Sequence, residues 1–216
     1  MAVPRRRLLA RVLAFWALAM TPLVDAAASP PAPLSAEDSA LVARAVAYLD
    51  SLTCDKGRFE QVDARGALTT GTFFLQRPGR ARFDYDPPSG LVIASNGFKV
   101  TVVDHRLKTI QGYPLAFTPL GLFLAKNIRL DRGVVVTAVD RTAAGFSITA
   151  RDRGHPNQGS IDMTFANDPI HLAGWTVTDS RGQSVQVRLA ALTPATPQNG
   201  RFFELADPAR EPGTAP

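Results

Sequence analysis

Hydrophobic and polar residues alternate between Gly71 and Pro88 in a way that predicts a β-hairpin. Every second residue of this stretch is apolar apart from one arginine, in the row Phe73, Leu75, Arg77, Gly79, Ala81, Phe83 and Tyr85. Because successive side chains of a strand point to opposite faces, one face of this hairpin meets a core and the other meets water. Arg77 is therefore expected on the apolar side.

Pro78 and Gly79 mark the turn of this hairpin, because proline presets the first corner and glycine tolerates a positive φ. A two-residue loop would place Arg77 opposite Arg80 and would divide the apolar residues between two faces. A three-residue loop pairs Arg77 with Ala81 and keeps them together, so we expect the three-residue loop. A guanidinium cannot lose its proton, so among apolar side chains it needs fixed acceptors or an escape to solvent.

The same alternation recurs along most of the chain and predicts around ten antiparallel strands, each wet on one face. The expected strands before residue 115 are 58–63, 68–77, 81–86, 91–94, 98–103 and 107–113, and later ones contain Ile148, Met163, Trp175 and Val187. Asn96-Gly97 predicts a tight hairpin between two of them. Short connections favour pairing in chain order, so the strands form a strongly curved sheet or barrel in a single, mainly β domain with a few helices.

Two segments predict helices. Ser35 is an N-cap with Asp38 three residues on, and apolar residues follow at helical spacing through Leu52. The second segment, 115–125, is almost continuously apolar, with Thr118 as N-cap and Pro119 at the first helical position. The residues expected to form this helix and cover the mouth of the curved sheet are Pro119, Leu120, Leu122, Phe123 and Leu124.

Gly121 weakens the second helix, which suits an element that moves. The alternative is a static plug of the core, and the sequence does not decide between the two. In either case a helix this short is unstable alone and has to pack against the sheet.

The N-terminus predicts a secretory signal peptide over residues 1–28. Four arginines precede an apolar run that is too short to span a bilayer comfortably, and Ala26-Ala27-Ala28 supplies the small residues needed for cleavage. The consecutive arginines are compatible with either general secretion or twin-arginine export. We expect a flexible leader over 29–34, the domain over 35–205 and a disordered tail over 206–216.

Charge and composition exclude several functions. The signal segment carries four arginines and one aspartate, so its removal leaves +2 of the formal net charge of +5, too little to indicate nucleic-acid binding. Cys54 is the single cysteine and is expected to be a buried apolar residue. The three histidines, His105, His155 and His171, lack the spacing of metal ligands. No nucleophile elbow, phosphate loop or dinucleotide motif occurs, so we expect neither catalysis, nor a metal, nor a cofactor.

Several motifs together resemble the family of outer-membrane lipoprotein carriers, LolA. They are Gly57–Val62, Gly71–Tyr85, Ser95–Gly97, Tyr113–Leu115 and Trp175–Asp179, in a chain ordered as signal, helix, strands, Leu-rich insert and strands. The resemblance covers roughly residues 35–205. The arginine–proline hairpin is its most specific part, whereas Asn-Gly alone is common.

The resemblance implies an unclosed antiparallel β-barrel with an apolar concave face lidded by helices. It implies a periplasmic monomer that takes lipoproteins from an inner-membrane ATP-driven transporter, holds their acyl chains, and delivers them to an acceptor at the outer membrane. Arg77 matches the family's lid latch. The residues expected to line the acyl-chain cavity are Phe73, Leu75, Ala81, Phe83, Tyr85, Leu91, Ile93, Val100, Ile148, Met163 and Trp175.

Two other functions remain open at this stage. The same cavity could serve a binding module for a free lipid or glycolipid, or the fold could belong to a sensor domain of an envelope-stress pathway. The three functions differ in their cargo: a whole lipoprotein, a small lipid, or none.

Overall fold

The computed structural model describes residues 34–126, 128, 133–190 and 192–209. The expected signal peptide, residues 29–33 of the leader and the end of the tail lie outside these residues. Within them, no helix combines the length and apolar character needed to cross a bilayer.

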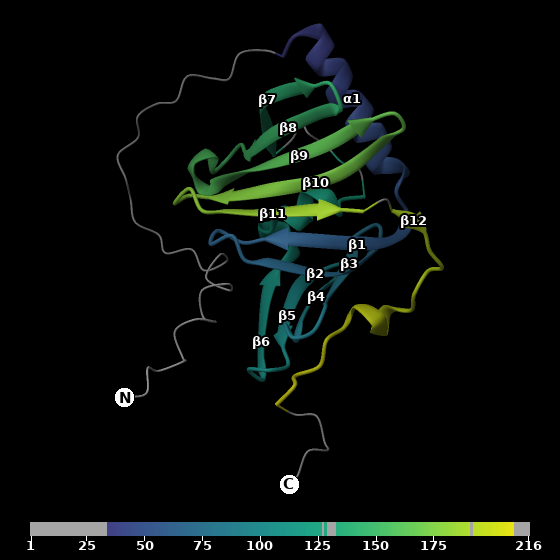
Figure 1. The fold of residues 1–216 in the computed structure, drawn as a ribbon, viewed down its shortest axis with the longest axis vertical. Coiled ribbons are helices and arrows are strands. Elements are labelled where there is room, and N and C mark those ends of the chain that lie inside the picture. The colour runs from purple at the N-terminus through teal and green to yellow at the C-terminus, as the bar shows by residue number, and fades with distance from the viewer. Residues whose placement is uncertain (1–33, 127, 129–132, 191, 210–216) are drawn as a thin grey trace. The chain divides into compact units, whose positions relative to one another are not determined.

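A twelve-stranded antiparallel sheet forms most of the described chain (Figure 1). Its first arm contains β1 (Cys54–Val62), β2 (Leu68–Gln76), β3 (Arg80–Tyr85), β4 (Leu91–Asn96), β5 (Lys99–Asp104) and β6 (Thr109–Pro114). Its second arm contains β7 (Val134–Thr142), β8 (Gly145–Asp152), β9 (Gly159–Asn167), β10 (Ile170–Asp179) and β11 (Ser184–Leu189). Neighbours within each arm follow chain order, as predicted, and β1 pairs with β11 to join the arms. β6 and β7 are the two edges, so the sheet is not closed.

Two strands were not predicted. β7 was missed because Val134, Val135 and Val136 are consecutive and a register shift between Val136 and Ala138 interrupts the alternation. β12 (Thr193–Pro194) is two residues long and pairs with β1. Neither strand has the period of two on which the sequence prediction relied.

The β2–β3 hairpin has the predicted three-residue loop, but the loop consists of Arg77, Pro78 and Gly79. Gln76 pairs with Arg80 and Leu75 with Ala81, so the predicted pairing of Arg77 with Ala81 is wrong. Arg77 belongs to the turn, and its backbone N–H donates to Thr53 O (2.8 Å), between the first helix and β1. The apolar residues still share one face, since the shift is two residues.

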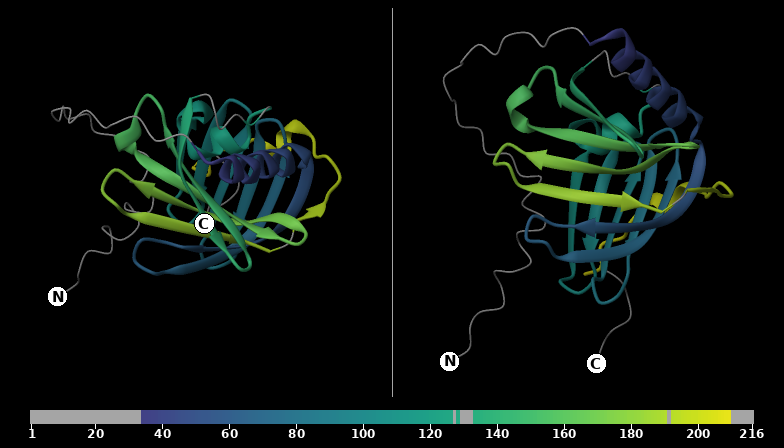
Figure 2. Two further views of the ribbon diagram at one scale, coloured as in Figure 1. Left: turned by 90° about the horizontal axis from the view of Figure 1, so that it is seen from above. Right: turned by 45° about the horizontal axis from the view of Figure 1, so that its top comes forward.

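The first helix, α1 (Ala36–Ser51), confirms the prediction. Ser35 Oγ accepts from Asp38 N at 3.0 Å, which caps the first turn. The helix lies across the opening of the curved sheet (Figure 2, left) and buries Ala45 and Leu49. It ends at Ser51 without a basic residue in its last turn.

The second helix begins at Pro119, as predicted, but it ends at Phe123, so Leu124 lies just after it. Leu115–Phe117 forms a 3₁₀ turn, η2, and only Pro119–Phe123 forms an α-helix, α2. The Thr118 hydroxyl turns back to donate to Leu115 O (2.8 Å), which ends η2 before α2 starts at Pro119. The apolar run is not buried throughout, because Phe117, which precedes the helix, is 85% exposed. The side chains of Pro119 and Leu122 lie outside the described part.

Packing at the junction of η2 and α2 explains why residue 121 is a glycine. A Cβ on Gly121 would lie 2.5 Å from Leu115 O, so the close approach of η2 and α2 requires glycine. The glycine that the sequence suggested as a source of weakness therefore also permits a compact turn.

The C-terminal segment covers the convex side of β2, β3 and β4 (Figure 1). Phe203, in the 3₁₀ turn η4 (Gly200–Phe203), is buried, and its ring lies 6.0 Å from that of Phe74. Arg82 donates to Phe202 O at 2.8 Å. Residues 206–209, expected to begin a disordered tail, belong to the described chain.

Candidate functional site

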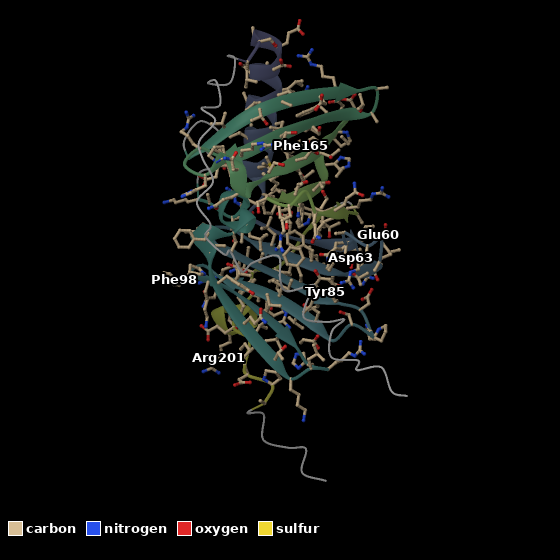
Figure 3. All side chains as sticks on the ribbon, turned by 90° about the vertical axis from the view of Figure 1, so that its left-hand side faces the viewer. Glu60, Asp63, Tyr85, Phe98, Phe165 and Arg201 are labelled. Carbon is tan, nitrogen blue, oxygen red and sulfur yellow. The ribbon has the colours of Figure 1, made fainter. Side chains whose placement is uncertain are left out.

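Aromatic side chains from three strands meet on the concave face of the first arm. The rings of Phe73 and Phe83, a cross-strand pair of β2 and β3, lie 4.6 Å apart. Tyr85 follows on the same face and, with Phe165 of β9, lies inside the fold (Figure 3). Tyr85 is partly buried, its hydroxyl donates to Gln61 Oε1 at 2.7 Å, and burial raises its pKa. The phenol therefore stays neutral and adds no charge to this apolar face.

Trp175 of β10 connects this group to the lid. Its ring centroid lies 5.9 Å from that of Phe123 in α2, 6.4 Å from Phe73 and 6.3 Å from Phe83. Leu124, at the end of α2, is fully buried in the same cluster, which Leu120 also contacts. α2 therefore covers the concave face through direct contact with the aromatic side chains.

Ten of the eleven residues predicted to line the cavity belong to this cluster, as buried or packed members: Phe73, Leu75, Ala81, Phe83, Tyr85, Ile93, Val100, Ile148, Met163 and Trp175. Leu91, the eleventh, lies on the same face of β4 but outside the cluster, near the far end of the sheet. The cluster also contains Ala45 and Leu49 of α1 and Phe123 and Leu124 of α2. The sheet, α1 and α2 therefore share one apolar interior.

Phe59 of β1 is a cluster residue that sequence reasoning missed. It is 1% exposed, and its ring meets those of Phe83 (5.5 Å) and Tyr85 (4.9 Å) edge-on. Its partner across β1–β2 is Gly71, where a Cβ would lie 2.6 Å from the Phe59 ring. A glycine opposite an aromatic residue was the available signal, but it requires the strand register to be known.

Arg77, in the β2–β3 turn, forms hydrogen bonds with α1 and with the chain that follows α2. Its side chain is 5% exposed and donates to Leu49 O near the end of α1 and, through Nη2, to Ala125 O after α2 (2.5 Å). Gly79 N, from the same turn, donates to Leu124 O at 2.8 Å. The guanidinium thus has fixed backbone acceptors, as its position on the apolar side requires, whereas Leu124 O accepts from a backbone N–H.

Asp50 completes the group around Arg77 and was not predicted. Its Oδ1 accepts from Arg77 Nη2 (3.1 Å) and from Ile128 N (3.2 Å). One carboxylate thus connects α1, the β2–β3 turn and the chain that follows α2. No sequence pattern identifies Asp50, because it is one of several acidic residues on α1.

Groups with negative charge surround the guanidinium of Arg77, but they do not satisfy every one of its hydrogen-bond donors. The carbonyls at the C-terminal end of α1 carry partial negative charge, and Asp50 adds a full one. Nε of Arg77 is buried and has no hydrogen-bond partner among the described residues. An unpaired buried donor costs about 1–3 kcal/mol, so this arrangement is less stable than a fully bonded one.

The other end of α1 is held by a second arginine. Arg141 of β7 pairs with Glu37 (3.1 Å) and Asp38 (2.5 Å) in the first turn of the helix. These groups are substantially exposed, so water and salt screen the pairs more than they screen Arg77.

The described residues contain no group of three potential metal ligands. His105, His155 and His171 are separated along the chain, and the last two lie against Asp152 (3.3 Å) and Pro169 O (2.9 Å). The arrangement around Arg77 and the aromatic cluster is suited to binding an apolar molecule beneath the lid.

The fold and the site together define a class of protein in which helices cover the apolar face of an open antiparallel sheet. A buried arginine forms hydrogen bonds with the covering segments. The chain belongs to the LolA family: residues 50–204 match the family described as "Outer membrane lipoprotein carrier protein LolA". This confirms the resemblance drawn from the sequence.

Three relatives named outer-membrane lipoprotein carrier protein are similar over most of their length. The protein of Alkalilimnicola ehrlichii is 34% identical over 74% of this chain and 77% of its own. Those of Pseudoalteromonas translucida and Methylococcus capsulatus are 29% and 26% identical, over 82% and 77% of this chain and 86% and 83% of their own. A solved LolA superfamily protein of Nitrosomonas europaea aligns with a TM-score of 0.43 at 7% identity, over 76% of this chain and 97% of its own.

Proposed function

We propose that this protein is a periplasmic carrier that holds the acyl chains of lipoproteins beneath its lid and moves them from the inner to the outer membrane. The observation that carries the proposal is the joint contact of Arg77 with Leu49 O of α1 and Ala125 O after α2, above a shared apolar cluster. Membership of the LolA family and the names of the relatives support it. The cargo would come from an ATP-driven transporter and pass to an outer-membrane acceptor.

Cargo binding requires the lid to part from the sheet. Phe73 and Leu75 are fully buried, and Trp175 packs against Phe123 of α2. An acyl chain reaches these side chains only after α2, and with it the contacts of Arg77, has been displaced. The chain then replaces the apolar contacts that the lid made, so the interior stays dry in both states.

The energetics explain why such a carrier needs a lid that competes with its cargo. Burial of an acyl chain contributes about 0.8 kcal/mol per methylene, so a chain of about sixteen carbons contributes roughly 12 kcal/mol relative to water. Several chains together would exceed the practical limit of about 20 kcal/mol for non-covalent binding. A carrier that bound them fully would release them too slowly, and the closed lid offsets part of this affinity.

In our proposal, Arg77 determines how strongly the closed lid competes with the cargo. Its hydrogen bonds stabilise the closed, empty state, whereas the unpaired Nε keeps this state from being too stable. Opening costs the carrier these bonds, and their re-formation promotes release. Loading is then driven by the transporter, and delivery by the acceptor's greater affinity.

The test is transfer of a fluorescent triacylated lipopeptide from the chain beginning at residue 29. We expect Arg77→Leu to load the lipopeptide at least as well as the unsubstituted chain and to transfer it at least about tenfold more slowly to acceptor vesicles, the effect of about 1.4 kcal/mol. Arg65→Leu, at an exposed turn, is the matched control and should leave both steps unchanged. Equal transfer by Arg77→Leu would contradict the role of Arg77.

The identity of the cargo needs a separate measurement. Native mass spectrometry of the protein isolated from periplasm should show complexes with the mass of a whole lipoprotein. Complexes with a free lipid only would refute lipoprotein carriage while leaving lipid binding intact.

A further inference from the structure

The two edge strands of the sheet, β6 and β7, differ in how well they are protected against pairing with another strand. β7 has a register shift, carries Asp140 and Arg141, and contacts α1, with which Arg141 forms ion pairs. β6 pairs with β5 over six consecutive residues without a shift, and its sequence, Thr109–Pro114, contains no charged residue. Bulges, charges and covering elements are the usual means by which a sheet edge avoids another strand. β7 has all three of them, whereas β6 is regular and uncharged.

The hydrogen-bond pattern between β5 and β6 determines which backbone groups of β6 point outward. Leu115 N donates to Phe98 O at 2.9 Å, which makes this a bonded pair of the antiparallel β5–β6 arrangement. Bonded and non-bonded pairs alternate, so the N–H and C=O groups of Ile110 and Gly112 point away from β5. In the described part of the chain no strand pairs with β6 on that side.

Gly112 has no evident role in the fold itself. Its φ is not among the positive glycine values, and a Cβ built on it meets no atom within 4 Å. Glycine within a strand weakens it and often marks a place where another backbone approaches closely. Here the open side of Gly112 is the free edge.

Exposed apolar side chains gather around the same edge. Of the five large hydrophobic residues exposed in the described chain, four flank or belong to β6: Phe98 (86%), Phe117 (85%), Leu107 (40%) and Ile110 (38%). Figure 3 shows Phe98 projecting outward from the turn between β4 and β5, whose backbone pairs with Leu115 just after β6. Exposed apolar residues that concentrate along one element are a feature of interaction sites on soluble proteins.

The charges near β6 are basic. Lys99 lies at the end marked by Phe98, and Arg106 and Lys108 lie in the turn at the opposite end. The acidic residue nearby, Asp104, is buried, and its Oδ1 accepts from Arg106 N and Leu107 N in that turn. A partner with acidic residues is therefore favoured at both ends.

We propose that β6 binds an extended segment of another protein, which adds to the sheet as a further strand. The segment pairs with Ile110 and Gly112, places apolar side chains against Phe98 and Phe117, and directs acidic side chains to the basic ends. Such strand addition takes its affinity from backbone bonds and its specificity from the flanking side chains. The proposal does not depend on what the interior carries.

Two other occupants fit the edge less well. An antiparallel pair of β6 strands from two copies would bring Lys99 of one copy near Lys108 of the other, which like charges oppose. A bilayer could accept Phe98 and Phe117 but offers no regular partner for a row of backbone N–H and C=O groups. The unpaired backbone groups of β6, a glycine that the fold does not require and the exposed aromatic residues together indicate that a polypeptide strand binds at this edge.

The test uses the chain from residue 29 and a synthetic nine-residue peptide of alternating valine and threonine with an aspartate at each end. NMR hydrogen exchange should show at least about tenfold slower exchange at Ile110 and Gly112 with the peptide bound, because each amide gains a hydrogen bond. Gly112→Pro removes the outward N–H and should abolish binding, whereas Gly112→Ala retains the N–H and should bind. Lys108→Glu should weaken binding at least about tenfold, in line with charge-pair coupling energies.

Three results would overturn the proposal. One is unchanged exchange of both amides at millimolar peptide. Another is binding that survives both Gly112→Pro and Lys108→Glu. The third is occupation of the edge by something else, seen as concentration-dependent dimerisation in sedimentation or as binding to phosphatidylglycerol vesicles that Gly112→Pro leaves unchanged. If Gly112→Pro does not fold, the Lys108→Glu titration and the exchange data decide the matter.

Discussion

Nη2 of Arg77 lies 3.1 Å from Oδ1 of Asp50, and the same oxygen accepts a bond from Ile128 N at 3.2 Å. The carboxylate therefore holds the guanidinium and the chain beyond α2 in one position relative to α1. Asp50 is 39% exposed, so its contribution is screened and is less than that of a buried ion pair.

Asp50→Ala should loosen the lid without unfolding the domain. We expect faster hydrogen exchange at Ile128 and slower cargo release, each by roughly fivefold, corresponding to about 1 kcal/mol for the lost bonds. Asp50→Asn retains an oxygen acceptor and should give a smaller change. Asp140→Asn, an exposed position on β7, is the control for loss of charge. If Asp50→Ala and Asp140→Asn behave alike, Asp50 does not position the lid.

Trp175 should report the state of the lid directly. The other tryptophan, Trp16, lies in the expected signal peptide, so the chain from residue 29 has Trp175 alone. Because its ring contacts Phe123, displacement of α2 by palmitate should change the emission and the acrylamide quenching of Trp175. Unchanged fluorescence at saturating palmitate would show that α2 stays in place.

A matched pair of phenylalanines separates lid packing from surface effects. Phe123→Ala should lower the free energy of unfolding by about 3 kcal/mol, because Phe123 is 6% exposed. Phe98→Ala, at 86% exposure, should stay within about 0.5 kcal/mol. Chemical denaturation measures both, and equal losses would contradict the packing of α2 described above.

Replacement by alanine should destabilise the fold at one glycine of the first arm and have little effect at another. Gly71→Ala places a methyl group 2.4 Å from Asp84 O and 2.6 Å from the Phe59 ring, so we expect a loss of about 2–3 kcal/mol. Gly112→Ala meets open space and should change stability by less than about 0.5 kcal/mol. Thermal unfolding of both variants tests whether the β1–β2 register is correct.

Acid should remove one contribution to stability that depends on Asp86. Arg58 donates to this carboxylate, as does the Thr70 hydroxyl, and these bonds hold the pKa of Asp86 below its usual value. A depressed folded-state pKa stabilises the fold above the ordinary aspartate pKa of about 3.9, and this gain is lost as pH falls through the folded value. Asp86→Asn should therefore melt below the unsubstituted chain at pH 7, and the difference should close in strong acid. A difference that persists unchanged at pH 2 would assign the effect to packing.

The sequence alone determined the elements whose signals are local. The alternation of Phe73 and Leu75 with polar neighbours identified the hairpin face, and the Ser35 cap located the start of α1, because strand and helix periods depend on residues close in the chain. The apolar run through Phe123 indicated a covering element, and Thr118 and Pro119 located the start of α2, although the 3₁₀ turn before it was not predicted.

Only the tertiary structure decided the contacts between distant segments. They include the pairing of β1 with β11, the position of Phe59 opposite Gly71 and the hydrogen bond between Asp50 and Arg77. The exposure of Phe98 beside the free edge likewise depends on the tertiary arrangement of the strands. No periodicity encodes such pairs, because they depend on how the sheet curves and on which of its edges is left without a neighbour.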